Sequence, residues 1–72
     1  MLNRYQVQLI EGGPADRQQF SVSADTIEGA AIRAAYELQQ EETADKIRML
    51  DNYAFIFWGS DGILCEIVQE RE

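Results

Sequence analysis

The spacing of apolar residues between positions 27 and 38 limits the fold of this chain more than any other feature. Apolar side chains recur there at i, i+3, i+4, i+7, i+8 and i+11, and they are Ile27, Ala30, Ala31, Ala34, Ala35 and Leu38. This spacing is typical of a helix with one apolar stripe. Four of the six residues are alanines, which let a helix axis lie close to the surface it covers. We therefore expect one helix packed on a sheet.

The ends of this helix have their own signals. Asp25 is of a type that caps helix N-termini, and Glu28 follows three residues later. The pair predicts a capping box, in which two backbone N–H groups at the helix start find side-chain acceptors. A polar run ends at Ala44, so we expect the helix to fade near Gln40 to Glu42.

The other segments have the pattern of β-strands. Residues 4–10 alternate apolar Tyr5, Val7 and Leu9 with polar neighbours, and residues 19–24 alternate in the same way. Three more strands are predicted at Lys46 to Leu50, Tyr53 to Trp58 and Ile63 to Gln69, separated by turn-forming residues 51–52 and 59–62. The expected order is ββαβββ. Such a chain forms a two-layer α+β sandwich, one helix on a mainly antiparallel five-stranded sheet.

The size and cysteine content indicate one intracellular domain. The chain has 72 residues, of which 46% are hydrophobic, so residues 1–72 are expected to form a single small domain. The only cysteine, Cys65, cannot form an internal disulfide, and a small secreted domain normally needs several. The first six residues lack a signal pattern, and no apolar run reaches the roughly 20 residues of a membrane span. We expect a cytoplasmic protein with no membrane partner.

The net charge favours a basic protein partner. Thirteen acidic and six basic residues give a net charge of −7. Residues 1–36 hold four acids and three bases and residues 37–72 hold nine acids and three bases, so −6 of this charge lies in the second half. Phosphate backbones would be repelled, whereas a basic surface would be steered towards that half. Direct nucleic-acid binding is therefore not expected.

The residue types needed for most catalytic sites are missing. There is no histidine, which excludes His-based general bases, nucleophile–His pairs and imidazole metal ligands. Cys65 lies among apolar neighbours and reads as a core residue. Gly12-Gly13-Pro14 lacks the Lys and Ser/Thr of a phosphate-binding loop and is expected to be a turn. We expect no enzyme activity, no catalytic residues and no cofactor.

A group of carboxylates near the end of the helix has two possible interpretations, a metal site or a solvated acidic surface. Glu37 and Glu41 are four residues apart, and Glu42 and Asp45 follow. Cation-binding loops place oxygen ligands at short fixed spacings around a glycine turn, which this segment lacks. A solvated acidic surface is therefore favoured over a metal site.

The strand from Tyr53 to Trp58 is apolar on both faces. It partly imitates the aromatic strand of RNA-recognition motifs, but Asp51 and Asn52 occupy the positions of the basic residue and glycine, and that fold needs a second helix. One helix covers only one face of the strand. The other is either shielded by long side chains such as Gln6, Gln8 and Arg48, or meets a partner or a second copy. We include Trp58 among the candidate partner-binding residues.

A second candidate surface lies on the outer side of the helix. Ile32 and Tyr36 are one turn apart and away from the alanine stripe, with Glu37 and Gln40 beside them. An apolar centre with an acidic rim fits a basic protein surface. The candidate partner-binding residues are therefore Ile32, Tyr36, Glu37, Glu41, Glu42, Asp45 and Trp58.

The segment from Phe20 to Glu42, with Phe20-Ser21-Val22-Ser23-Ala24-Asp25-Thr26-Ile27-Glu28-Gly29-Ala30-Ala31 at its start, resembles the strand-to-helix segment of small type I anti-CRISPR proteins of phages and mobile elements. The spacing of the strands from Asp45 to Ile67 is also similar. The resemblance implies an inhibitor that docks on a subunit of the crRNA-guided surveillance complex and blocks target DNA. The acidic residues from Glu37 onward would then imitate DNA phosphates.

The sequence leaves open two hypotheses that assign other functions to the protein. The strand Tyr5 to Leu9 and the helix start at Thr26 also resemble small antitoxin domains that mask a basic RNase toxin, although three strands after the helix exceed that pattern. A homodimeric structural module is the other alternative.

Overall fold

The computed structural model describes residues 2–13, 16–38 and 44–70. The elements are β1 (Asn3–Glu11), β2 (Gln19–Ala24), α1 (Ile27–Leu38), β3 (Lys46–Leu50), β4 (Tyr53–Trp58) and β5 (Asp61–Gln69). The order ββαβββ and the α+β class are as predicted, with one helix against a five-stranded sheet. The predicted end of the helix near Gln40 to Glu42 lies outside the described residues, and α1 is described as far as Leu38.

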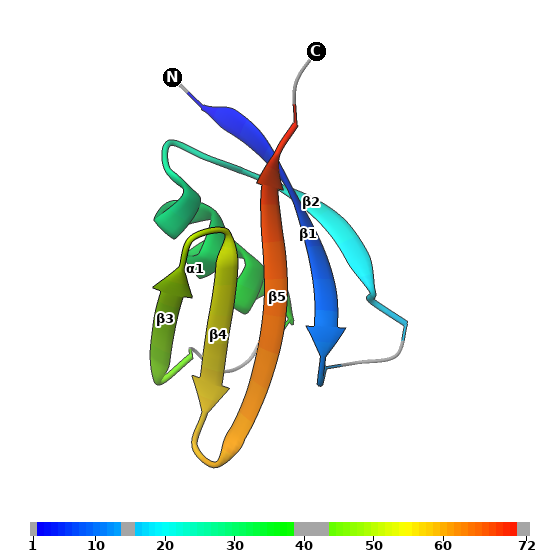
Figure 1. The fold of residues 1–72 in the computed structure, drawn as a ribbon, viewed down its shortest axis with the longest axis vertical. Coiled ribbons are helices and arrows are strands. Elements are labelled where there is room, and N and C mark those ends of the chain that lie inside the picture. The colour runs from blue at the N-terminus through cyan, green and yellow to red at the C-terminus, as the bar shows by residue number, and fades with distance from the viewer. Residues whose placement is uncertain (1, 14–15, 39–43, 71–72) are drawn as a thin grey trace.

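The last strand lies in the middle of the sheet. The strand order is β2-β1-β5-β4-β3, and all four neighbouring pairs are antiparallel. Figure 1 views the sheet from its uncovered side, with β5 running through the centre and α1 behind the strands. The β5 strand joins the β1–β2 hairpin to the β3–β4 hairpin, so the fold depends on a pairing between the first and last strands.

The core lies between α1 and one face of the sheet. Ala30, Ala31 and Ala34 have no exposed surface and Ala35 is 3% exposed, so the predicted alanine stripe is the buried side of the helix. The strands contribute the larger side chains, of which the most deeply buried are Val7, Ile56, Cys65 and Ile67. Ile27 and Leu38 are partly buried against this core at the two ends of the stripe. Small residues on the helix and branched residues on the strands fill one layer.

The helix is capped by Thr26, which corrects the prediction of an Asp25–Glu28 capping box. The Thr26 hydroxyl accepts a hydrogen bond of 3.0 Å from the backbone N–H of Gly29. The Thr26 carbonyl accepts the first helical bond, 2.9 Å, from the N–H of Ala30. These are the two bonds that define an N-cap residue. With Thr26 at the N-cap, the third helical position is Gly29, which has no side chain to complete a capping box.

A bulge at the end of β1 changes which face its last residue occupies. Leu9 is paired with Cys65, but the next paired residue is Glu11, opposite Leu64. One extra residue in a strand reverses the alternation of side chains beyond it. Glu11 therefore lies on the uncovered face. The chain then turns at Gly12 (φ 81°), where an added Cβ would lie 2.6 Å from the carbonyl oxygen of Gly62.

Candidate protein-interaction surfaces

The side of the sheet that α1 leaves uncovered carries an apolar patch, here called the aromatic face. Phe55 is paired with Arg48 on β3 and with Leu64 on β5, and none of these three belongs to the buried layer. Leu50 is 64% exposed, Tyr53 37% and Phe55 36%, while Phe57 and Leu64 are partly buried. The aromatic face consists of Leu50, Tyr53, Phe55, Phe57 and Leu64. Exposed apolar groups that adjoin one another mark interaction sites more often than scattered ones do.

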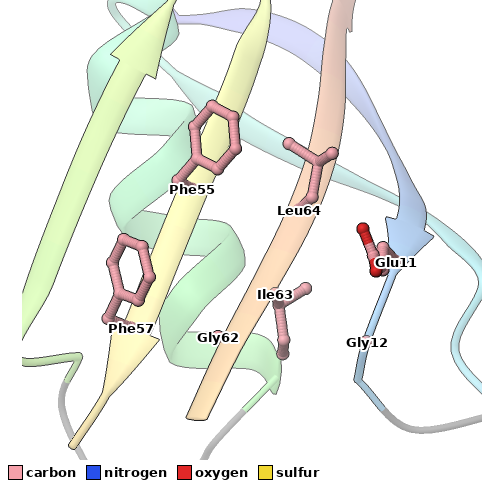
Figure 2. Close-up of a pocket in the computed structure, with 7 residues that line it drawn as sticks. All are labelled: Glu11, Gly12, Phe55, Phe57, Gly62, Ile63 and Leu64. Atoms are coloured by element: carbon pink, nitrogen blue, oxygen red, sulfur yellow. The ribbon is translucent and has the colours of Figure 1, made fainter. Parts of the chain in front are cut away.

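Two depressions flank the phenylalanine side chains of β4. One lies towards β5 and β1 and is lined by Glu11, Gly12, Gly62, Ile63 and Leu64 in addition to the two rings. Figure 2 shows Phe55 and Phe57 on β4, Leu64 on β5 and Glu11 at the end of β1 around it. The other lies towards β3 and is lined by Arg48, Met49 and Leu50. The aromatic face is thus a raised strip with a hollow on each side.

A glycine opposite Phe57 shapes this relief. Gly62 is its register partner on β5, and an added Cβ there would lie 3.1 Å from Cδ1 of the Phe57 ring. The ring therefore leans across β5 into space that any larger residue would occupy. Aromatic cover of a strand glycine also supports the pairing of the two strands.

Charges of opposite sign lie on the two sides of the aromatic face. Lys46 and Arg48 flank it on β3, and Glu11 flanks it on β1. Within residues 2–13, 16–38 and 44–70 none of these three makes an ion pair. The uncovered face of β1 and β2 is polar. Gln6 lies opposite Ser21 there, and Arg4 Nε forms an ion pair of 3.2 Å with Glu70 Oε2.

Trp58 does not belong to the uncovered face, which corrects its inclusion among the candidate partner-binding residues. It alternates with Phe57 along β4 and so points to the helix side, where it is 7% exposed. Its indole Nε1 is buried without a hydrogen-bond partner. The exposed aromatic residues of β4 are instead Tyr53 and Phe55.

The outer side of α1 carries the second apolar patch, here called the helix patch. Ile32 is 60% exposed and Tyr36 58% exposed, and the neighbouring Arg33 and Glu37 are exposed as well. Both apolar residues lie where the sequence predicted them, away from the alanine stripe. The helix patch therefore has a charge of each sign beside an apolar centre.

The predicted acidic cluster is only partly described, and its described members have partners. Glu37 forms an ion pair with Arg17, with 3.6 Å between Glu37 Oε2 and Arg17 Nη1. The same Arg17 nitrogen donates a hydrogen bond to the Glu37 carbonyl oxygen. The Asp45 carboxylate accepts a hydrogen bond from the backbone N–H of Gly59 and so holds the β4–β5 turn. Glu41 and Glu42 lie outside the described residues, as does Gln40. In the part of the chain that is described, no three His, Cys, Asp or Glu side chains gather as a metal site would require.

Cys65 lies in the core, as its apolar neighbours predicted. It has no exposed surface, and burial raises the pKa of its thiol to about 11. The reactive thiolate is therefore scarce at neutral pH, which is the opposite of what a nucleophilic cysteine requires.

Two features of the aromatic face were missed by sequence reasoning. Glu11 was not linked to it, because it flanks this face only through the pairing of β1 with β5 and through the bulge. Arg48 was expected only as a long side chain that shields the face, and not as a charge at its border. The alternation of Lys46 and Arg48 with Ile47 and Met49 was a usable signal, since it places both cations on one face of β3.

No protein-family model, curated protein or solved structure matches this chain. No helix in the described ranges is long and apolar enough to cross a membrane. The structure defines a small two-layer α+β domain with an exposed apolar patch on each layer.

Proposed function

We propose that this protein is a non-catalytic binding protein that docks its helix patch on a basic protein surface. One observation carries the proposal: Ile32 and Tyr36 are both more than half exposed, one turn apart, on a helix whose other side is fully packed. The helix packs on the sheet through the alanine stripe, with Ile27 and Leu38 at its two ends, so these two large side chains are left for another contact. Tyrosine is among the residues enriched at the centres of protein interfaces, which a polar rim surrounds.

The net charge of −7 supports a basic partner, because it accelerates encounters with surfaces rich in Lys and Arg. The idea that carboxylates from Glu37 onward imitate DNA phosphates has less support. Glu37 is paired with Arg17, and Asp45 holds the turn at Gly59. The proposal therefore assigns the contact to Ile32 and Tyr36 and the steering to the charge of the whole chain.

The specific partner proposed is a subunit of a type I crRNA-guided surveillance complex, whose target-DNA binding this protein would block. This part rests on the sequence resemblance of Phe20 to Glu42 to small type I anti-CRISPR proteins. The antitoxin alternative has no structural observation in its favour, since β3, β4 and β5 all follow the helix.

The test compares two variants in binding to a purified type I surveillance complex and in inhibition of its target-DNA binding. We expect the double variant Ile32→Ser/Tyr36→Ser to bind at least tenfold more weakly, because it removes both anchors. Leu2→Ser is the matched control, since Leu2 is 67% exposed and directly precedes β1 rather than lying on the helix. Unchanged binding of the double variant would refute the role of the helix patch.

A second comparison addresses DNA mimicry. Reversal of Glu37, Glu41, Glu42 and Asp45 to lysine abolishes inhibition if these carboxylates replace phosphates. If inhibition survives while the Ile32→Ser/Tyr36→Ser variant loses it, mimicry is wrong and the apolar contact is right. If the wild-type protein does not bind the complex at all, the specific partner is wrong. Recovery of a basic RNase from a lysate would then support the antitoxin reading.

A further inference from the structure

We propose that the aromatic face is the contact surface for a second copy of this chain, related to the first by a two-fold axis that runs along the strands between β4 and β5. The proposal is independent of the helix patch, because the aromatic face lies on the side of the sheet that α1 does not cover (Figure 1). It commits to a symmetric dimer of facing sheets, since two-fold dimers are the commonest oligomers and sheets pack face to face through interdigitating side chains.

One register row across the sheet carries the argument. Through successive pairings, the row runs from Arg48 on β3 to Phe55 on β4, then to Leu64 on β5 and Glu11 on β1. The row thus has a cation at one end, an anion at the other and two apolar residues between them. A row of this kind is complementary to its own reverse.

The proposed axis performs this reversal. A rotation of 180° about a line between β4 and β5 places β4 of one copy over β5 of the other, and β3 over β1. Arg48 then faces Glu11 of the second copy, and Phe55 faces Leu64 of the second copy. Because the contact is isologous, each pairing occurs twice.

The relief of the surface fits the same arrangement. Phe55 and Phe57 project from β4, and the depression beside them is lined by Gly62 and Leu64 of β5 and by Glu11 (Figure 2). Since β4 lies over β5 of the other copy, the raised side chains of each copy enter the depression of the other. Sheets pack about 10 Å apart when their side chains interdigitate in this way.

The charges are available for this contact. Arg48 and Glu11 make no ion pair within the described ranges. The half of the face towards β2 is polar and already holds the Arg4–Glu70 pair, so it does not favour a dry contact. The apolar area covers parts of three strands only, which is small for a permanent dimer, and we therefore expect a dissociation constant on the order of micromolar.

The test measures self-association by sedimentation equilibrium of the full chain from about 1 µM to about 1 mM, a range that spans weak interfaces. We expect the wild type to be dimeric at the upper end. Arg48→Glu and Glu11→Arg, each alone, place like charges opposite each other twice in the dimer and weaken it roughly tenfold. The double variant Arg48→Glu/Glu11→Arg restores the opposite charges and should recover most of the association.

Arg33→Glu is the matched control, because it makes the same charge reversal at an exposed position on the helix. It should leave self-association unchanged. A wild type that is monomeric throughout the range would overturn the proposal. So would a double variant no better than the single variants, because recovery requires that Arg48 and Glu11 face each other. Thermal denaturation of each variant confirms that the chain is folded.

Discussion

The buried residue Cys65 makes the stability of this fold depend on pH. It lies on the central strand β5, opposite Leu9 on β1 and Ala54 on β4, and has no exposed surface. Burial raises the pKa of its thiol from 9.0 to about 11. The folded protein therefore holds the proton more tightly than the unfolded chain does. The thiol acts as a small apolar group in the one strand that joins both hairpins.

This difference predicts a loss of stability at alkaline pH. Below about pH 9 both states keep the thiol protonated and the full stability is present. As the pH rises from 9 to about 11, the unfolded chain releases its proton first, and the free energy of unfolding falls. A difference of about two pKa units corresponds to a loss of about 2–3 kcal/mol. Urea denaturation at several pH values between 8 and 11 measures it.

Cys65→Ala is the control for the alkaline titration. It removes the thiol and changes no other ionisable group, so its pH dependence lacks the contribution of Cys65. The variant is less stable at every pH because it leaves a small cavity. Its free energy of unfolding should fall less steeply than that of the wild type above pH 9. Equal slopes would contradict the assignment to Cys65.

At the scale of single elements, the helix depends on its first turn. The Thr26 hydroxyl bonds the N–H of Gly29, and Gly29 itself is a poor helix former. Removal of the hydroxyl in Thr26→Ala should therefore lower the free energy of unfolding by about 1 kcal/mol. Thr26→Ser keeps the acceptor oxygen and should lose much less. Chemical denaturation followed by circular dichroism compares the two, and an equal loss would show that the hydroxyl is not the cap.

The element boundaries were predictable because they depend on local patterns. A period of two identified β1 and β2, turn-forming residues separated the three later strands, and the alanine stripe identified the buried side of α1. The cap was misplaced by one residue because Asp25 and Thr26 are both competent cap residues, and sequence alone does not choose between them. The side of Trp58 could not be assigned because β4 is apolar on both faces. Only the position of α1 decides which face is covered.

At the scale of the whole molecule, one of the two surfaces could also be predicted from local patterns and part of the other could not. The helix patch was predictable, because Ile32 and Tyr36 follow from the period of one helix. The acidic border of the aromatic face was not, because it requires the strand order and the bulge near Glu11. Both depend on the pairing of β1 with β5, residues more than 50 positions apart in sequence. Such long-range pairings carry no local signal.

At this scale the two-layer architecture predicts that the two apolar patches act independently. The helix patch lies on α1 and the aromatic face lies on the opposite side of the sheet, with the core between them. Substitutions that share no contacts usually have additive effects. Ile32→Ser/Tyr36→Ser should therefore leave the dimer dissociation constant unchanged in sedimentation equilibrium. Arg48→Glu should likewise leave the affinity of a single chain for a soluble partner unchanged.

The two variants should differ on a surface coated with partner protein. A dimer with a helix patch on each outer side can engage two immobilised partner molecules at once, which slows its release. Arg48→Glu should speed dissociation from a dense surface and have no effect on a sparse one, because it removes bivalency and leaves the helix patch intact. Ile32→Ser/Tyr36→Ser should weaken binding at every density. A density-independent effect of Arg48→Glu would mean that the aromatic face itself contacts the partner, and the two patches would then form one site rather than two.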